Sequence, residues 1–515
     1  VIMKELFTIP SDHLGTGRVR FAWSPKGQYM AAVGTNRKVN IYDRNGKLFN
    51  EIMLPPAEGE EEEPVVEEKK KKKKGAPAAG PKWVDPDEPC ALLQWDSSGK
   101  KLAVLASQCS VCVIWIAKTM DVVKLDTNWR AQELTWLQWS RRGDILAIGT
   151  SKGNLMLYND NEKKKVPIQG KHTRAITCGQ WNVENMLAMG GEDSMLTVTD
   201  GADGDTIKSI SLKFEPQEVI FSSKKETDSR GARVETTLSI NVGRKSIYLL
   251  SAMGDQQDDP LELAFQERYG DILRHAWYGD GYIVIGFQSG QVVVVSTHNA
   301  ELSEEVHSEA YLPSNLVDMD VCAAVGRVAV AGNRSVKVIE LGTGYKEVVA
   351  DAIELNRGGI QAVKWTDDGS VLTLATATGS IHSYLATLPV VHASFMTRVA
   401  YLTSLQEISV VDVLSGNKQA VQIETEPAFL GLGPNHVAVG MNNQAWFYRC
   451  EADGKGSTIQ VNTRDYMGSV GKVYMTETYA AVMSEGSVTV HPIEPSEYAE
   501  GEEEWQGPAQ GDQGG

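Results

Sequence analysis

Ser151 stands between two glycines in a pattern that hydrolytic enzymes use. Residues 149–153 read Gly-Thr-Ser-Lys-Gly and match the G-x-S-x-G motif of esterases, in which the serine sits on a sharp turn from a strand into a helix. The residues on both sides of Ser151 predict strands instead, and residues 286–290 repeat the two glycines at the same place in a later repeat. We therefore expect hairpins whose glycines supply positive φ, and no catalytic residue.

Cys109 and Cys112 have the C-x-x-C spacing of redox and zinc sites. A structural zinc site needs a second pair of ligands, and no second cysteine pair lies at a suitable distance in the sequence. Residues three apart on a strand also point to opposite faces. The sequence therefore predicts two packed thiols and no metal-ligating residues, and the scattered pattern of all six cysteines is typical of reduced thiols in the cytosol.

Two glycine pairs, at 342–344 and 431–433, begin like the phosphate-binding loop of dinucleotide enzymes. Glu347 and His436 stand where the third glycine of that loop would be, and neither segment opens a predicted helix. The paired aspartates at 367–368 lie in a predicted turn, where aspartate stabilises the backbone. None of these patterns indicates a cofactor, so we expect no cofactor-binding residue.

A tryptophan recurs at the end of a short apolar strand and is followed by a tight turn and a more hydrophobic strand. The copies are Trp23, Trp95, Trp139, Trp181, Trp277 and Trp365. Intervals of roughly 40 to 45 residues between well-formed copies are typical of a propeller whose blades each have four strands. His172 precedes one of these tryptophans as part of a Gly-Lys-His sequence, and we expect it to form a buried structural hydrogen bond rather than to transfer protons.

Composition limits the classes of protein to which the chain can belong. It has 515 residues, of which 42% are apolar, and a net charge of −17. A nucleic-acid binder would need clustered lysine and arginine, so we expect no nucleic-acid partner. We expect no transmembrane segment, because no stretch approaches roughly 20 apolar residues. We also expect no secretory signal at the first residues.

The repeats predict an all-β protein with tandem WD40-type β-propellers. Seven units before residue 345 predict a first propeller over 1–344, in which residues 5–9 supply the outermost strand of the seventh blade and so close the ring. Residues 346–355 resemble a second strand of that kind. About four further units, the first at 360–385, predict an incomplete second propeller over 345–494.

Two charged segments belong to no blade. Residues 55–89 contain an acidic run followed by a lysine run at 69–74, and residues 495–515 form an acidic end. Such composition buries too little apolar surface to offset the entropy of ordering, so we expect a disordered insertion and a disordered tail. The lysines could contact an acidic partner or the surface of an anionic membrane, although such a run is usually only solvated.

Five stretches carry a resemblance that is more specific than the general fold. They lie at 170–181, 277–281 leading on to 292–298, 365–369, 397–405 and 436–448, and they resemble the intraflagellar transport protein 144 family, also called WD repeat-containing protein 19. The resemblance implies two propellers followed by a helical solenoid, in a subunit of the IFT-A complex of cilia. It also implies retrograde transport from ciliary tip to base, entry of membrane cargo, and a location in the cilium or flagellum, the basal body and the cytoplasm.

Two classes of function fit these observations. The first is a non-catalytic scaffold that binds other IFT-A subunits, transport trains and ciliary membrane-protein cargo, or alternatively a coatomer-like subunit of a vesicle coat. The second is a propeller hydrolase, which would require acid, base or metal groups that converge in the central channel. The repeats suggest no such set, so the sequence favours the scaffold.

Overall fold

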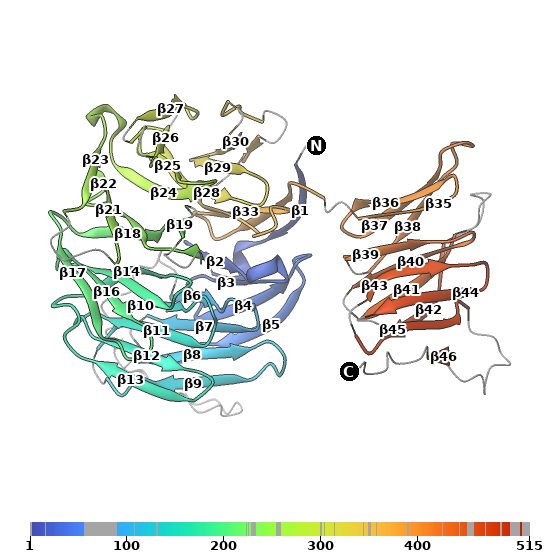
Figure 1. Cartoon of the computed structure of the whole chain (residues 1–515), viewed down its shortest axis with the longest axis horizontal. Coiled ribbons are helices and arrows are strands. Elements are labelled where there is room, and N and C mark those ends of the chain that lie inside the picture. Colours follow the sequence, from blue (N-terminus) through green and yellow to red (C-terminus); the bar gives the residue numbers. More distant parts are fainter. Residues whose placement is uncertain are drawn as a thin grey trace, which may run out of the picture. The chain divides into compact units, whose positions relative to one another are not determined.

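The computed structural model describes residues 3–494 and 505–506, apart from 16, 56–89, 108, 130–131, 223, 225, 228–232, 254–258, 299–300, 303, 314, 343, 349–351, 357, 389–390, 425, 442, 451–457, 469 and 485–486. Its strands form two units, Val1–Ala386 and Thr387–Gly515, each described here by itself (Figure 1). The only helices in the described part of the chain are three short 3-10 turns: η1 (Ser11–His13), η2 (Pro25–Gly27) and η3 (Glu267–Tyr269). The prediction of an all-β protein is confirmed.

Eight four-stranded antiparallel sheets make up the described part of the first unit, and in seven of them the strands follow one another in chain order. The first sheet consists of β2 (Arg20–Trp23), β3 (Tyr29–Val33), β4 (Lys38–Asp43) and β5 (Leu48–Met53), and the second of β6 (Ala91–Trp95), β7 (Lys101–Ala106), β8 (Val111–Ile116) and β9 (Val122–Asp126). The third consists of β10 (Leu134–Trp139), β11 (Ile145–Thr150), β12 (Leu155–Asn159) and β13 (Lys164–Ile168), and the fourth of β14 (Ile176–Trp181), β15 (Met186–Gly191), β16 (Met195–Asp200) and β17 (Thr206–Ser211). The next three are β18 (Pro216–Phe221), β21 (Thr237–Val242), β22 (Ser246–Ser251) and β23 (Leu261–Ala264); β24 (Ile272–Tyr278), β25 (Tyr282–Phe287), β26 (Gln291–Ser296) and β27 (Glu305–Ala310); and β28 (Leu316–Cys322), β29 (Arg327–Gly332), β30 (Ser335–Glu340) and β31 (Ile353–Glu354). The eighth combines β32 (Ile360–Trp365), β33 (Val371–Thr376) and β34 (Ile381–Leu385) with β1 (Lys4–Ile9), and β19 (Glu226–Thr227) with β20 (Arg233–Val234) forms a small separate ribbon.

The first strands of the eight sheets form the inner wall of a ring. Each contacts the next in order, from β2 through β6, β10, β14, β18, β24 and β28 to β32, and the colours of Figure 1 run round the unit in the same order. The middle strands are covered by sheets on both sides, which explains their continuous apolar runs. All six residues of β11 are buried, for example, whereas the outermost strand β13 is half-buried or exposed.

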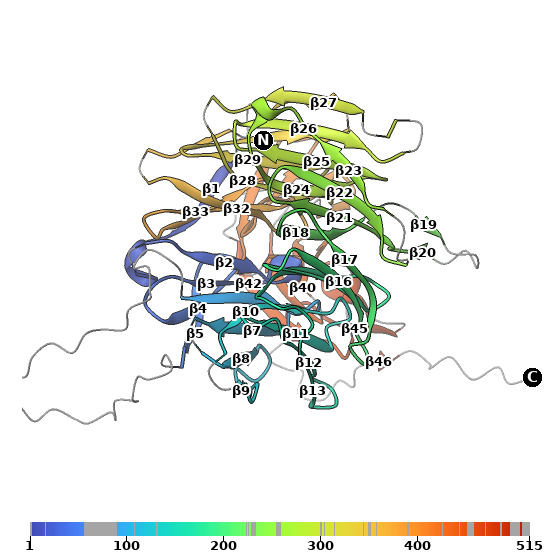
Figure 2. The ribbon, with the colours of Figure 1, turned by 90° about the vertical axis from the view of Figure 1, so that its left-hand side faces the viewer.

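Strand β1 closes the ring, but on a different sheet from the one that the sequence predicts. It pairs antiparallel with β34, from Lys4 opposite Leu385 to Ile9 opposite Ile381, and in Figure 2 it lies in blue beside the gold strands of the eighth sheet. The prediction that residues 5–9 complete the seventh blade is wrong. The seventh sheet takes its outermost strand, β31, from residues 353–354, which pair with β30.

The expected domain boundary at 344/345 is wrong for the same reason. Residues 346–355 are not the start of a second ring, because β31 belongs to the seventh sheet and Ile339 bridges to Glu347. The unit around Trp365 is the eighth sheet of the first ring, which therefore ends at Ala386. A two-residue strand gives too weak an alternation to be recognised as the partner of β30, so the sequence suggested seven blades.

The described part of the second unit contains three further sheets of the same kind instead of the expected four, because the first of those four, around Trp365, belongs to the first ring. They are β35 (His392–Phe395), β36 (Arg398–Ser404), β37 (Glu407–Asp412) and β38 (Lys418–Gln422); β39 (Phe429–Leu432), β40 (His436–Met441), β41 (Gln444–Arg449) and β42 (Ile459–Asp465); and β43 (Val470–Met475), β44 (Tyr479–Ser484), β45 (Ser487–Pro492) and β46 (Trp505–Gln506). Strand β46 lies inside the expected disordered tail and pairs with the edge of β45. The rest of that tail lies outside the described residues, as does the expected insertion 55–89 with its lysine run, apart from Pro55.

The two glycine motifs are hairpins, as predicted, but only their second glycines have the predicted conformation. Gly153 and Gly290 have φ of 76° and 87° in the turns after β11 and β25. Gly149 and Gly286 lie within those strands and face the next sheet. A Cβ on Gly149 would come within 2.8 Å of Ile176, so the first glycine allows two sheets to approach closely.

His172 forms the buried hydrogen bonds that the sequence predicts. Its Nδ1 lies 2.9 Å from Asp193 Oδ1 and its Nε2 lies 3.0 Å from Thr197 Oγ1. The N–H of Thr173 donates to the other carboxylate oxygen of Asp193 at 2.8 Å. Burial raises the pKa of Asp193, but the hydrogen bonds from His172 and Thr173 outweigh it, and the pKa lies below its ordinary value.

The closure on β34 can be tested with a cross-link. Thr8 lies opposite His382, and their side chains are 3.0 Å apart. Since opposed residues on antiparallel strands lie within disulfide range, the double variant Thr8→Cys/His382→Cys should form an intramolecular disulfide on mild oxidation. Peptide mapping by mass spectrometry detects it. The matched control Thr8→Cys/Lys337→Cys places the second cysteine on β30 of the seventh sheet; a disulfide there, and none at 382, would contradict the observed closure.

The hydrogen bonds of Asp193 make a pH-dependent contribution to stability. Because the folded-state pKa is lowered, this contribution is present above the unfolded carboxyl pKa of about 4 and is lost as the pH falls through the folded value. At pH 7, Asp193→Asn should lower the free energy of unfolding by about 1–3 kcal/mol. Thermal unfolding followed by circular dichroism measures the difference, which should shrink at acid pH. Asp203→Asn, in an exposed turn, should show little difference at any pH.

Candidate functional site

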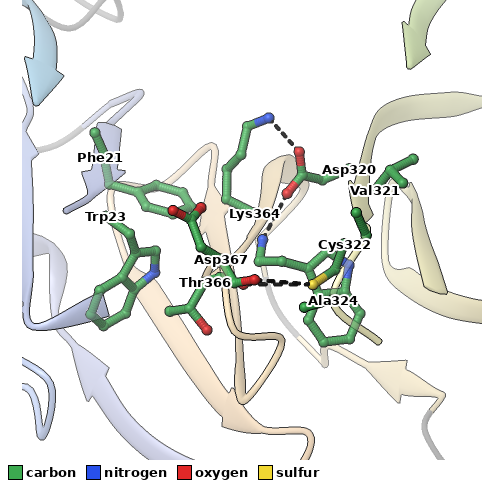
Figure 3. A pocket seen from close by; sticks show the side chains of 12 residues that line it. Phe21, Trp23, Asp320, Val321, Cys322, Ala324, Lys364, Thr366 and Asp367 are labelled. Carbon is green, nitrogen blue, oxygen red and sulfur yellow. Dashed lines mark hydrogen bonds and ion pairs between the residues drawn. The ribbon is translucent and has the colours of Figure 1, made fainter. Parts of the chain in front are cut away.

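A pocket of about 550 Å³ opens on the inner wall of the first unit, where its last sheets meet its first. Three segments line it: residues 21–23 from β2, residues 320–324 from the end of β28, and residues 364–367 from the end of β32. Figure 3 shows their side chains converging from these three sheets. The ring closure described above brings the first of these segments beside the last.

Lys364 and Asp320 form an ion pair on one side of the pocket. Lys364 Nζ lies 2.6 Å from Asp320 Oδ1, and the backbone N–H of Trp365 donates to the other oxygen at 2.8 Å. Burial lowers the pKa of Lys364, but the carboxylates of Asp320 and Asp318 more than offset it, so the pKa lies above its ordinary value. Lys364 therefore stays charged, and its ammonium is paired with the carboxylate of Asp320.

Asp367 faces the middle of the pocket without such a partner. In Figure 3 its carboxylate lies between Phe21 and the Asp320 side of the pocket, and no hydrogen bond to that carboxylate is found among the described residues. Although the side chain reaches solvent, partial desolvation inside the pocket raises the pKa of Asp367, and the neighbouring carboxylates of Asp368 and Asp320 raise it further. The pocket therefore holds one carboxylate that nothing in the described chain neutralises.

Asp368, the next residue, has the opposite environment. Its Oδ2 lies 2.7 Å from Arg44 Nη2, which reaches across from the first sheet, and its Oδ1 accepts hydrogen bonds from Thr366 Oγ1 at 2.6 Å and from the N–H of Ser370 at 3.1 Å. Burial raises the pKa of Asp368, but these contacts outweigh it and the pKa is lowered. Only Asp368 has the turn-stabilising role that the sequence predicts for both aspartates.

Cys322 lines the pocket but is not a nucleophile. Its Sγ lies 3.8 Å from the carbonyl oxygen of Thr366 and 3.7 Å from that of Asp367. Burial raises the pKa of this thiol, and the protonated thiol is weakly reactive. The pocket therefore lacks an activated group for covalent catalysis among its lining residues.

Other charged side chains on the inner strands also pair with one another. Arg274 Nε lies 2.9 Å from Asp318 Oδ1, and His275 Nδ1 lies 2.8 Å from Glu218 Oε2. These carboxylates also accept backbone N–H groups of the next sheet: Asp318 that of Val363 at 3.0 Å, and Glu218 that of His275 at 3.2 Å. Their role in the structure is to join neighbouring sheets. The sequence did contain a sign of these links, namely charged residues inside the otherwise apolar first strands, but its motifs and repeats do not predict them.

The motif residues of the sequence are not brought together into one site. Ser151 lies in the turn after β11, and the buried side chains of Cys109 and Cys112 pack into two different apolar clusters. Glu347 pairs with Lys337, and His436 bonds Glu494 in the second unit. Within the described ranges, no group of three or more His, Cys, Asp or Glu residues is placed so that it could hold a metal ion.

No helix in the described part of the chain is long and apolar enough to cross a membrane.

Comparison with solved structures shows the propeller fold. The C-terminal WD40 domain of Sif2 superposes with a TM-score of 0.54 at 12% identity, covering 75% of this chain and 99% of that structure. The designed protein Ika8 gives the same TM-score at 13% identity, covering 74% of this chain and 100% of that structure. At such identities the likeness concerns the fold alone.

Comparison with protein families is more specific. The family described as WDR19 first beta-propeller matches residues 19–379, and the one described as WDR19 second beta-propeller matches residues 399–514. These matches agree with the boundary at Ala386 and not with the one predicted at 344.

Curated relatives extend the match over almost the whole chain. WD repeat-containing protein 19 of Mus musculus is 36% identical over 96% of this chain, that of Homo sapiens is 36% identical over 98%, and WD repeat-containing protein dyf-2 of Caenorhabditis elegans is 25% identical over 94%. The chain spans 34% of the length of each. The resemblance predicted from five short stretches is thus confirmed, and the chain belongs to the WD repeat-containing protein 19 family.

Proposed function

We propose that the protein is a non-catalytic scaffold subunit of the intraflagellar transport complex A. The observation that carries this proposal is that both propeller families of WDR19 match the chain in order, over 19–379 and 399–514. A ring of sheets linked at every inner strand is a rigid support that can present loops to several partners at once. The partners that we propose are other IFT-A subunits, transport trains and ciliary membrane-protein cargo, and the proposed locations are the cilium or flagellum, the basal body and the cytoplasm.

Apart from Asp367, the described charges that line the pocket and the inner strands beside it are paired, and this supports a role without catalysis. A hydrolase needs an acid, a base or a nucleophile that is free to reach its substrate. Asp320 and Asp318 are each bound to a cation and to a backbone N–H, and Cys322 is a protonated thiol. These groups hold sheets together and are therefore poorly placed to move protons to a substrate.

The scaffold role is tested by purification from ciliated cells. The tagged protein, expressed in ciliated cells that lack their own copy, should co-purify with IFT-A subunits. Its removal should leave transport particles accumulated at ciliary tips, because retrograde transport returns them to the base. Quantitative mass spectrometry and fluorescence imaging measure the two effects. Recovery of coatomer subunits without IFT-A subunits would contradict the proposal and favour a vesicle coat.

The absence of catalysis is tested with a substrate screen. We expect no turnover of nitrophenyl esters or glycosides above the buffer rate, because Ser151 lies in a hairpin between two strands. The variant Ser151→Ala should behave as the unchanged protein does. Robust ester turnover that Ser151→Ala abolishes would show that this serine is a nucleophile.

A further inference from the structure

The pocket on the inner wall contains an electrostatic imbalance that the scaffold role does not explain. Three lining residues carry charge: Asp320 and Lys364, which neutralise each other at 2.6 Å, and Asp367, which has no partner in the described chain. The neighbouring Asp368 is matched by Arg44 at 2.7 Å. One negative charge is left over inside a concave site. A carboxylate in such a place is stabilised when a cation approaches it.

The walls around Asp367 are aromatic. Phe21 and Trp23 from β2 lie on one side of the pocket in Figure 3, and Trp365 from β32 also lines it. The faces of aromatic rings attract cations, and Trp does so most strongly. An apolar ligand would bury Asp367 without a partner, and an anionic ligand would meet its charge directly, so the lining selects a cation with a flat or apolar body.

The pocket is open to a ligand from solvent. The side chain of Lys364 is 46% exposed although it lies on the inner wall, and Asp367 is exposed as well. A volume of about 550 Å³ lies within the range of small-ligand sites. It is large enough for one long side chain and far too small for a folded domain.

From these features we infer that the pocket binds an arginine side chain presented by a protein partner. A guanidinium group can donate two parallel N–H hydrogen bonds to the two carboxylate oxygens of Asp367, and its plane can stack on the half-buried ring of Trp23. The ammonium of Lys364 stays on Asp320 and bounds the site on the opposite side. The inference uses only the geometry of the first unit, so it stands or fails separately from membership of the transport complex.

The test is calorimetric titration of the full chain with two short peptides. The first is acetyl-Gly-Ser-Arg-Ser-Gly-amide, and the second carries citrulline in place of arginine, which keeps the shape and removes the charge. We expect the arginine peptide to bind and the citrulline peptide to bind at least tenfold more weakly. Equal binding of the two peptides would overturn the inference. Agmatine that binds as tightly as the arginine peptide would assign the pocket to a free guanidinium compound and would also overturn it.

Two variants and a control locate the binding. Asp367→Asn should weaken the arginine peptide at least tenfold, and its fold should be unaffected because that carboxylate makes no hydrogen bond within the described residues. Lys364→Gln should strengthen binding of the arginine peptide severalfold, since it removes a positive charge that repels the guanidinium group. A variant that only disturbed the fold would weaken binding instead. Asp121→Asn, in the exposed turn between β8 and β9, should leave the affinity unchanged. Unchanged affinity in Asp367→Asn would place the peptide elsewhere and contradict the inference.

Discussion

The closed ring of the first unit depends on the pairing of its first strand, β1, with the last strand of its eighth sheet, β34. An eighth sheet built only from β32, β33 and β34 would leave the outer edge of β34 unpaired, and exposed strand edges are liable to pair with other chains. Strand β1 covers that edge, and Ile9, only 2% exposed, packs with Leu14, Phe21 and Ile381 into one apolar cluster. The backbone that leaves β1 continues into β2, so the chain itself connects the eighth sheet to the first. The ring therefore cannot open without breaking the ladder between β1 and β34 and the apolar cluster around Ile9.

The remaining joints of the ring follow from a second constraint. Strands in different sheets do not share a backbone ladder, so side chains must supply the polar links between them. The recurring tryptophans do this: the indole N–H groups of Trp95 and Trp181 donate to the carbonyl oxygens of Ala22 and Gln138 in the preceding sheet, and that of Trp277 donates to Ser239 Oγ at 2.7 Å. The indole N–H of Trp365 has no hydrogen-bond partner among the residues that the structure describes, and here Asp320 and Asp318 accept the backbone N–H groups of β32 instead.

How far the sequence predicts the structure can be argued from these same residues. The tryptophan spacing and the glycine turns are local patterns, and they predicted the sheets and the hairpins. The buried role of His172 was predicted in the same way. The destination of β1 could not be predicted, because Glu5 to Ile9 alternates as any outermost strand does and nothing local distinguishes β30 from β34 as the edge to be covered. The number of sheets in the first ring was predicted wrongly for a related reason. Strand β31 is only two residues long, and it can be recognised from its pairing with β30 but not from its own composition.

The different environments of Asp367 and Asp368 in the pocket could not be predicted from the sequence around them. Asp367 and Asp368 are adjacent and chemically identical, and a turn predicts the same role for both. The folded ring separates them, because Asp368 pairs with Arg44 from the first sheet, whereas the carboxylate of Asp367 has the negative charges of Asp368 and Asp320 nearby and forms no hydrogen bond among the described residues. Their pKa values therefore shift in opposite directions, and this difference arises at the seam between residues that are more than three hundred positions apart in the chain. The closure that completes the eighth sheet is thus also what creates an unmatched charge beside it, and a binding site at that seam is a property of the closed ring rather than of any single repeat.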